Sequence, residues 1–182
     1  MRRIAKTASE KHGTIVVRRA PAKKSRAILQ FGTLRIPAAI GRSGTTALKR
    51  EGDGATPIAS MRVLHGFWRG DRMLGLTTAL PMQRIRSGML WCDAPESPSY
   101  NQLVRTPFKA SHEEMRRSDG LYDVCLVLDW NITSRRRNRG SAIFFHLIRP
   151  GYEPTAGCVA VKARDMMRLL PLLRRGSRLR VA

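Results

Sequence analysis

The chain is poor in aromatic and acidic side chains. Only 6% of its 182 residues are Phe, Trp or Tyr, and 13 acidic residues stand against 34 Lys and Arg, a formal net charge of +21. Residues 1–28 contain nine of the basic residues, one acidic residue and no aromatic ring. Because a surface that stacks nucleic-acid bases needs aromatic rings beside its basic groups, we expect a solvated basic surface rather than a nucleic-acid site. Such a surface could still bind anionic polymers by electrostatic attraction.

Long hydrophobic runs are also missing. The longest apolar run near the start is residues 15–17, Ile-Val-Val, which is too short for the apolar region of a secretion signal. No stretch reaches the length that a transmembrane helix needs. We therefore expect no membrane span, and no secretion signal is visible. The chain is long enough to bury the core of one domain.

Cysteine is scarce, and its spacing does not indicate a metal site. Cys92, Cys125 and Cys158 are widely separated, and neither a C-x-x-C nor an H-x-x-x-H pattern accompanies the four histidines. Cys125 lies in the apolar run 124–128, where a buried thiol is the simplest interpretation. Cys92 follows a tryptophan in a proline-rich stretch and has no evident partner. We expect no metal and no organic cofactor.

His146 and Cys158, twelve positions apart, have the residue types of a base and a thiol nucleophile. The thiolate is the reactive form of cysteine, and a nearby imidazole can receive the thiol proton. Gly157 has no side chain, so the backbone can turn sharply just before the cysteine. At this spacing alone, a buried His and Cys are more often packing residues, so the flanking sequence decides.

The flanking sequence resembles the catalytic signature of the L,D-transpeptidase (YkuD-type) family. The resemblance lies in residues 140–146, Gly-Ser-Ala-Ile-Phe-Phe-His, and residues 154–160, Pro-Thr-Ala-Gly-Cys-Val-Ala. Residues 40–44, Ile-Gly-Arg-Ser-Gly, and 49–57, Lys-Arg-Glu-Gly-Asp-Gly-Ala-Thr-Pro, are similar to an earlier segment of the same family. The resemblance covers roughly residues 37–182.

The resemblance implies a mostly β (α+β) fold, a β-sandwich with short flanking helices. It implies that Cys158 attacks a tetrapeptide stem of peptidoglycan, releases D-Ala and forms a thioester, and that an amine of a second stem then attacks the thioester. His146 would accept the thiol proton, and the N–H groups of Gly157 and Cys158 would hold the oxyanion. The implied location is the periplasm or cell envelope, with the cytoplasm as the alternative. Anionic envelope polymers are a possible further partner.

Three positions depart from the family pattern and leave the reaction open. Many members have Ser-His-Gly-Cys, whereas this chain has Thr155 and Ala156 before the glycine, and Ala160 replaces a basic or amide residue. Thr155 keeps the hydroxyl, but Ala156 cannot replace an imidazole. A hydrolase of the same fold, either an L,D-carboxypeptidase or an L,D-endopeptidase, is therefore an alternative. Two others are a basic protein that binds nucleic acid or an anionic polymer, and a non-catalytic wall-binding module.

Two further residues are candidates for substrate binding. Arg149 could bind a stem carboxylate with two hydrogen bonds, but a solvated loop arginine fits its position equally well. Glu51 lies in a glycine-rich loop before a Thr-Pro pair, where acidic residues most often shape a turn. We therefore expect a structural role for Glu51 ahead of a role in substrate binding.

Patterning along the chain predicts short strands and few helices. We expect a basic N-terminal segment over residues 1–30 with a possible first strand, and a catalytic domain over 31–182 that contains an irregular insertion at 70–110. Ser111 and Glu114 have capping-box spacing, which predicts a short helix ending by residue 120. A second, amphipathic helix is expected at 164–170. Strands are predicted at residues 14–18, 27–31, 61–68, 122–130, 141–146 and 177–181.

Overall fold

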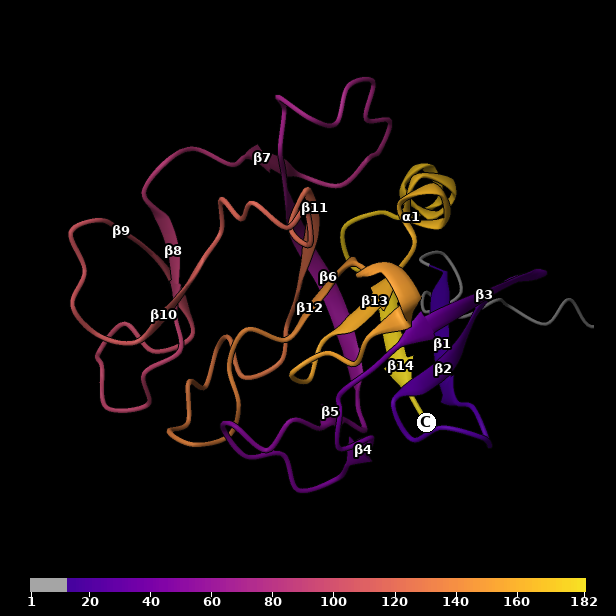
Figure 1. The fold of residues 1–182 in the computed structure, drawn as a ribbon, viewed down its shortest axis with the longest axis horizontal. Coiled ribbons are helices and arrows are strands. Elements are labelled where there is room, and N and C mark those ends of the chain that lie inside the picture. The colour runs from indigo at the N-terminus through magenta and orange to yellow at the C-terminus, as the bar shows by residue number, and fades with distance from the viewer. Residues whose placement is uncertain (1–12) are drawn as a thin grey trace, which may run out of the picture.

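The computed structural model describes residues 13–182, and the first twelve residues of the basic N-terminal segment lie outside this range (Figure 1). The fold is mostly β, with one short α-helix. The strands are β1 (Thr14–Arg19), β2 (Arg26–Phe31), β3 (Leu34–Ala39), β4 (Thr45–Thr46), β5 (Thr56–Pro57), β6 (Ser60–Trp68), β7 (Met82–Arg84), β8 (Met89–Cys92), β9 (Gln102–Arg105), β10 (His112–Glu114), β11 (Val124–Leu128), β12 (Phe144–Leu147), β13 (Val159–Val161) and β14 (Arg178–Val181). The helices are α1 (Ala163–Leu169) and two 3-10 turns, η2 (Pro150–Tyr152) and η3 (Leu170–Leu172).

The main sheet closes on itself. Its strand order is β11-β12-β13-β3-β2-β1-β14-β6-β7, and an additional β11–β6 pairing joins the two sides. The closure depends on the nine-residue β6, whose first residues pair with β14 and whose later residues pair with β11. The mostly β prediction is therefore confirmed. The architecture differs from the predicted sandwich, because one long strand hydrogen-bonds to both ends of the sheet and leaves a closed ring.

The interior of the closed sheet is the larger of two hydrophobic clusters. Every second residue along a strand points into this cluster. In β1, for example, Ile15 and Val17 are fully buried, while their neighbours point outward. β11 is buried on both faces, since Leu126 belongs to the interior cluster and Cys125 to the second cluster. Helix α1 contributes Met166 and Leu169 to the interior cluster. The unbroken apolar run at 124–128 thus forms the strand shared by both clusters.

The second cluster lies between the closed sheet and a three-stranded sheet of order β10-β8-β9. Figure 1 shows this small sheet on the side of the molecule opposite α1. Trp91 of β8 packs edge-on against Phe144 of β12, with ring centroids 5.0 Å apart. The predicted irregular insertion at 70–110 therefore contains β7, β8 and β9. Its prolines obscured these strands, but all four residues of β8 are buried.

The helix predicted from the Ser111 and Glu114 capping box is wrong. Residues 112–114 form β10, which pairs with β8 and places Glu114 opposite Leu90. Tertiary pairing outweighs the local capping signal, because the strand also delivers the fully buried Met115 to the second cluster. The amphipathic helix predicted at 164–170 is confirmed as α1, and Pro171 falls in η3 directly after it.

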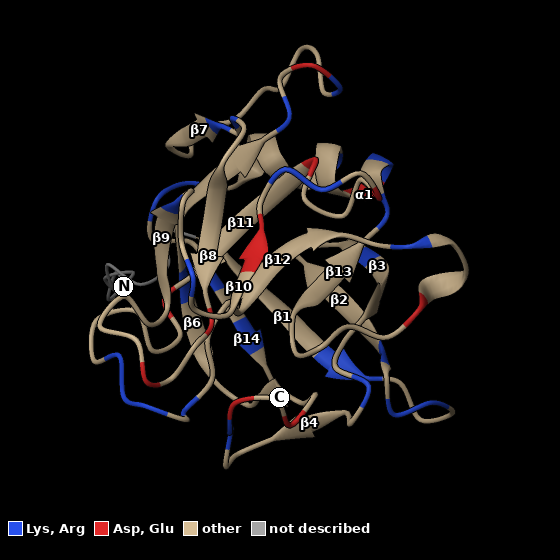
Figure 2. Ribbon diagram, turned by 60° about the vertical axis from the view of Figure 1, so that its left-hand side comes forward, with Lys and Arg blue, Asp and Glu red and all other residues tan. Residues whose placement is uncertain are grey.

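The other strand predictions are confirmed with adjusted ends. β1, β2, β6 and β14 cover the predicted segments, whereas β11 is shorter than predicted and β12 begins at Phe144. Basic side chains are spread over many strands and loops, as Figure 2 shows. Within residues 13–182, no helix has the length and apolar character needed to cross a membrane.

Candidate active site

Cys158 lies immediately before β13, beside the start of β12. The two strands run parallel, with Val159 opposite Phe145 and Ala160 opposite His146. The Cys158 thiol donates a hydrogen bond to the Ala142 carbonyl oxygen at 3.1 Å and accepts one from the Phe144 N–H at 3.4 Å. The side chain is 7% exposed. The Ala142 carbonyl and the Phe144 N–H therefore hold the sulfur beside the start of β12.

His146 lies within β12, and its ring is held in one tautomer. Nδ1 is 2.7 Å from the Leu147 carbonyl oxygen. A carbonyl can only accept, so Nδ1 must carry the proton, and Nε2 is left with a free lone pair. The ring also meets the Tyr122 ring edge to face, with centroids 5.3 Å apart. This arrangement gives His146 a fixed orientation and an unprotonated Nε2.

A cavity of about 330 Å³ brings most of the predicted site residues together. Five of the seven line it, namely Cys158, His146, Thr155, Ala156 and Arg149. Gly157 and Glu51 are not among the lining residues. The sequence therefore singled out residues that the structure brings together at one cavity.

The loop before Cys158 is fixed by a threonine. The Thr155 hydroxyl accepts a hydrogen bond from the Gly157 N–H at 3.2 Å and donates one to the Cys158 carbonyl oxygen at 2.7 Å. Gly157 has φ +145°, and a Cβ there would lie 3.0 Å from the Ala55 carbonyl oxygen. Glycine is thus required by conformation and by space. In this state the Gly157 N–H points to Thr155, so oxyanion binding by this group would require the hydrogen bond to be exchanged.

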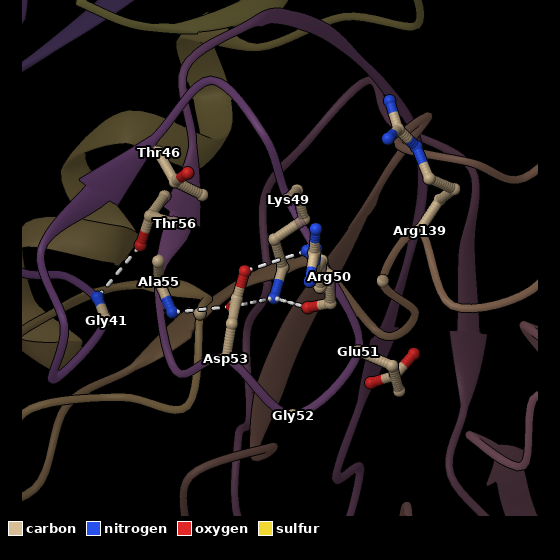
Figure 3. A network of polar contacts seen from close by, with 12 residues as sticks. Gly41, Thr46, Lys49, Arg50, Glu51, Gly52, Asp53, Ala55, Thr56 and Arg139 are labelled. Carbon is tan, nitrogen blue, oxygen red and sulfur yellow. Dashed lines mark hydrogen bonds and ion pairs between the residues drawn. The ribbon is translucent and has the colours of Figure 1, made fainter.

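The segment 49–57 holds a network of polar contacts (Figure 3). Lys49 is only 3% exposed, and its Nζ lies 2.5 Å from Asp53 Oδ1 and 2.9 Å from the Arg50 carbonyl oxygen. Burial opposes ionisation of Asp53, but hydrogen bonds from the Arg50 N–H, Lys49 and the Ala55 N–H outweigh it and lower the Asp53 pKa. The buried ion pair therefore has its charges compensated within the loop.

Contacts from this loop reach the cysteine itself. The Thr56 hydroxyl accepts a hydrogen bond from the Gly41 N–H at 2.8 Å and donates one to the Cys158 carbonyl oxygen at 3.3 Å. The position of a Cβ on Gly157 would be 3.5 Å from Lys49 Nζ. Segments 40–44 and 49–57, which carry part of the sequence resemblance, thus support the loop that holds Cys158.

Glu51 belongs to the same loop but faces elsewhere. Its carboxylate accepts a hydrogen bond from the Tyr100 hydroxyl, and burial together with this carboxylate raises the Tyr100 pKa. Figure 3 shows Glu51 on the other side of the loop from the Lys49–Asp53 pair. The contact ties the loop to Tyr100, which follows β8. The position of Glu51 therefore favours a structural role.

The candidate pair, Cys158 and His146, is uncharged in this structure. Burial raises the pKa of the Cys158 thiol to about 12, and the Glu113 carboxylate adds to the increase. Burial also lowers the pKa of His146 to about 4. Near neutral pH the site therefore holds a thiol and a neutral imidazole rather than a preformed ion pair. Nucleophilic attack from this state must be accompanied by transfer of the thiol proton to a base.

The opposite wall of the cavity consists of residues that the sequence did not single out. Glu113, Arg117, Leu121 and Tyr122 line it, and the Tyr122 hydroxyl donates a hydrogen bond to Glu113 Oε2. Glu113 and Arg117 were missed because their segment was predicted to be a short helix, and Leu121 and Tyr122 because nothing in the sequence placed the start of the predicted strand 122–130 beside Cys158. No local pattern indicates that β10 pairs with β8 and lies against β12.

The charged groups at the cavity rim form a network. Arg117 binds the Asp119 carboxylate through two nitrogens, at 2.9 and 2.7 Å, and Arg149 reaches the same carboxylate at 3.2 Å. Hydrogen bonding by Arg117 is the main reason that the Asp119 pKa is strongly lowered. Within residues 13–182, no three His, Cys, Asp or Glu side chains converge as metal ligands would.

The fold and the cavity define a mostly β domain with a buried thiol and imidazole on adjacent parallel strands. The model of the YkuD L,D-transpeptidase catalytic domain matches residues 14–181. The chain therefore belongs to this family, as its sequence signature implied. No curated protein matches the chain.

Solved structures of two mycobacterial enzymes are similar to the chain at low identity. L,D-transpeptidase 1 of Mycobacterium tuberculosis is 10% identical, with a TM-score of 0.40, and the match covers 93% of this chain and 62% of that one. An L,D-transpeptidase from Mycobacterium smegmatis is 11% identical, with a TM-score of 0.40 and coverages of 93% and 59%. This chain thus spans about three fifths of each.

Proposed function

We propose that this protein is a cysteine-dependent peptidoglycan L,D-transpeptidase with Cys158 as nucleophile and His146 as base. The family assignment supports the substrate class. The observation that carries the residue assignment is that Cys158 and His146 line one cavity from adjacent strands, and the hydrogen bond to Leu147 leaves His146 Nε2 unprotonated. A base must offer a free lone pair, and this tautomer leaves one on Nε2.

In the first half-reaction, Cys158 attacks the carbonyl at the L-centre of the diamino acid in a tetrapeptide stem. As the S–C bond forms, the thiol proton passes to His146 Nε2. The tetrahedral intermediate then breaks its C–N bond, His146 returns the proton to the departing amine, and D-Ala leaves. The product is a thioester on Cys158. Backbone N–H groups of Gly157 and Cys158 are the proposed oxyanion donors, once Gly157 releases the Thr155 hydroxyl.

In the second half-reaction, an amine of a second stem attacks the thioester. The C–S bond breaks, the thiol regains a proton, and a peptide bond links the two stems. This activity belongs to peptidoglycan biosynthesis and the organisation and shape of the cell wall. It places the protein in the bacterial cell envelope or periplasm, and it makes the protein a carbapenem target.

A hydrolase of the same fold is the second candidate. Ala156 and Ala160 both line the cavity, so methyl groups stand where many family members carry an imidazole and a basic or amide side chain. Fewer polar groups are then available to hold an acceptor stem. If water attacked the thioester instead, the protein would be an L,D-carboxypeptidase or L,D-endopeptidase with the same Cys158 and His146.

The test is to incubate the protein with disaccharide tetrapeptides and identify the products by mass spectrometry. We expect cross-linked dimers from the wild type and no product from Cys158→Ala or His146→Ala. Cys92→Ala is the matched control, because Cys92 is also buried but lies outside the cavity. Shortened stems without dimers would favour the hydrolase. Unchanged turnover in Cys158→Ala would refute the proposal.

A further inference from the structure

Glu113 is a carboxylate in the cavity to which the proposed chemistry assigns no task. It lies in the centre of β10, half-buried, and lines the cavity together with Cys158 and His146. Tyr122 donates its hydroxyl to Glu113 Oε2, and the Tyr122 ring meets the His146 ring. Burial raises the Tyr122 pKa, so the hydroxyl remains a donor. The carboxylate is therefore oriented by a neighbour that itself contacts the proposed base.

The second carboxylate oxygen is free. Among residues 13–182 the structure records no hydrogen bond to Glu113 Oε1, and this atom is not one of the buried polar atoms without a partner, while Glu113 lines the cavity that contains Cys158. No Lys or Arg in that range lies within ion-pair distance of Glu113. Arg117, the nearest basic side chain on the same wall, is bound to Asp119.

An unpaired acid is unexpected here, because the chain carries a net charge of +21. The other acidic residue that lines the cavity, Glu153, lies 3.7 Å from Arg149, and the neighbouring Asp119 binds both Arg117 and Arg149. Burying a carboxylate without a cation is unfavourable, and here burial raises the Glu113 pKa. A cationic group of a ligand would remove this cost.

Glu113 also opposes the first half-reaction. Its charge raises the pKa of Cys158, so it makes the thiolate harder to form. A residue that slows acylation and is unpaired in the resting structure must serve another step or merely pack. The transfer to an amine brings a positively charged nitrogen to the thioester carbon, because a primary amine is an ammonium near neutral pH.

We propose that Glu113, oriented by Tyr122, binds the ammonium group of the acceptor and removes a proton from it. This inference rests on the proposed transpeptidase function and adds the acceptor site to it. The ligand class is a primary ammonium on a diamino-acid side chain of a peptide. The site would compensate for the polar groups that Ala156 and Ala160 do not supply.

The ammonium transfers one proton to the Glu113 carboxylate, and the resulting amine attacks the thioester carbonyl. The C–S bond then breaks with its electron pair on sulfur. The second proton on nitrogen passes through His146 to the sulfur, which leaves an amide and the Cys158 thiol. Glu113 finally releases its proton to water.

The experiment measures how the acyl-enzyme partitions between aminolysis and hydrolysis. Wild type, Glu113→Gln and Glu114→Gln are each given a tetrapeptide donor and increasing amounts of a tripeptide acceptor with a free side-chain amine. Glu114 is the matched control, because it is the next residue of β10, is exposed and points to the opposite face. Acylation by a carbapenem, which involves no amine, is timed in parallel.

We expect the ratio of aminolysis to hydrolysis in Glu113→Gln to fall by about 100-fold, the size of a lost acid–base group. Carbapenem acylation of this variant should become about threefold faster, since the charge that raises the Cys158 pKa is gone. Glu114→Gln should match the wild type in both assays. Glu113→Asp should recover part of the lost ratio, because it keeps the carboxylate.

Three results would overturn the inference. A wild-type partition ratio in Glu113→Gln with acylation intact would remove Glu113 from the acceptor site and leave the proposed nucleophile untouched. Loss of both acylation and transfer in Glu113→Gln would assign the residue to the structure of the cavity. If the wild type itself formed no acyl-enzyme, both this inference and the proposed function would fail.

Discussion

The buried ammonium of Lys49 lies 2.5 Å from the Asp53 carboxylate, directly behind the glycine that precedes Cys158. The pair lies in segment 49–57, one of the two regions that resemble the family. It does not line the cavity. Its position indicates that the segment supports the Cys158 loop and does not bind substrate.

Removing Lys49 should destabilise the fold. In Lys49→Met the partly exposed Asp53 carboxylate loses its cation but keeps two backbone N–H donors, so we expect the free energy of unfolding to fall by about 2 kcal/mol, the order of one lost hydrogen bond to a charged group. Urea unfolding measures this loss. Lys109→Met is the control, because Lys109 is exposed and should change stability by less than about 0.5 kcal/mol. Equal stabilities of the two variants would contradict the structural role of Lys49.

Thr155 should be needed for acylation through its hydroxyl. That hydroxyl bridges the Gly157 N–H and the Cys158 carbonyl oxygen. We expect Thr155→Val, which keeps the shape, to slow carbapenem acylation by about 10-fold to 100-fold, since a misplaced nucleophile costs this much. Thr155→Ser should stay within a few-fold of the wild type. If the valine variant reacted as fast as the serine variant, the hydrogen bonds would not position Cys158.

Stability should decrease in mild acid because of His146. Burial lowers its pKa in the folded protein from 6.5 to about 4, so the unfolded chain binds more protons between these values. Stability then falls as the pH drops below 6.5, by about 3 kcal/mol once the pH is below 4. Between pH 7.5 and 4.5 the His146 contribution should be about 2 kcal/mol.

Urea unfolding of His146→Gln at the same two pH values isolates this contribution. The variant should lose about 2 kcal/mol less than the wild type on acidification. Burial also lowers the pKa of His65, so His65→Gln serves as a parallel variant that separates the two histidines. An identical pH dependence in the wild type and His146→Gln would show that His146 titrates normally in the folded protein.

Restoring an imidazole before Gly157 should favour transfer over hydrolysis. Ala156 is exposed and lines the cavity, so Ala156→His can be accommodated without displacing a core residue. We expect the ratio of cross-linked to hydrolysed product to rise several-fold, because the imidazole adds a polar group at the acceptor side. Product analysis with a tetrapeptide donor measures the ratio. An unchanged ratio would mean that Ala156 does not account for the departure from the family pattern.

One half of the candidate site could be predicted from the sequence. Cys158 and His146 are separated by only eleven residues and lie at the edges of two adjacent parallel strands, so a local motif suffices to bring them together. The apolar runs beside them gave β11 and β12 correctly. The predicted site residues Thr155, Ala156 and Arg149 line the cavity for the same reason, since they lie in the connection between those strands.

The other half depends on pairing between distant segments. Glu113 reaches the cavity only because β10 pairs with β8, and the local pattern around Ser111 favoured a helix instead. Glu51 illustrates the opposite case. It lies in a segment that resembles the family, yet its contact with Tyr100 turns it toward the small sheet. The closed sheet was unpredictable as well, because closure depends on the second partner of β6.

The location of the acyl group tests the assignment of Cys158 as the nucleophile most directly. The protein is incubated with a carbapenem, digested and sequenced by tandem mass spectrometry. We expect one adduct per molecule, on the peptide that carries Cys158, in the wild type and in Cys92→Ala, and no adduct in Cys158→Ala. An adduct on Cys92 or Cys125, or an adduct that persists in Cys158→Ala, would contradict Cys158 as the nucleophile.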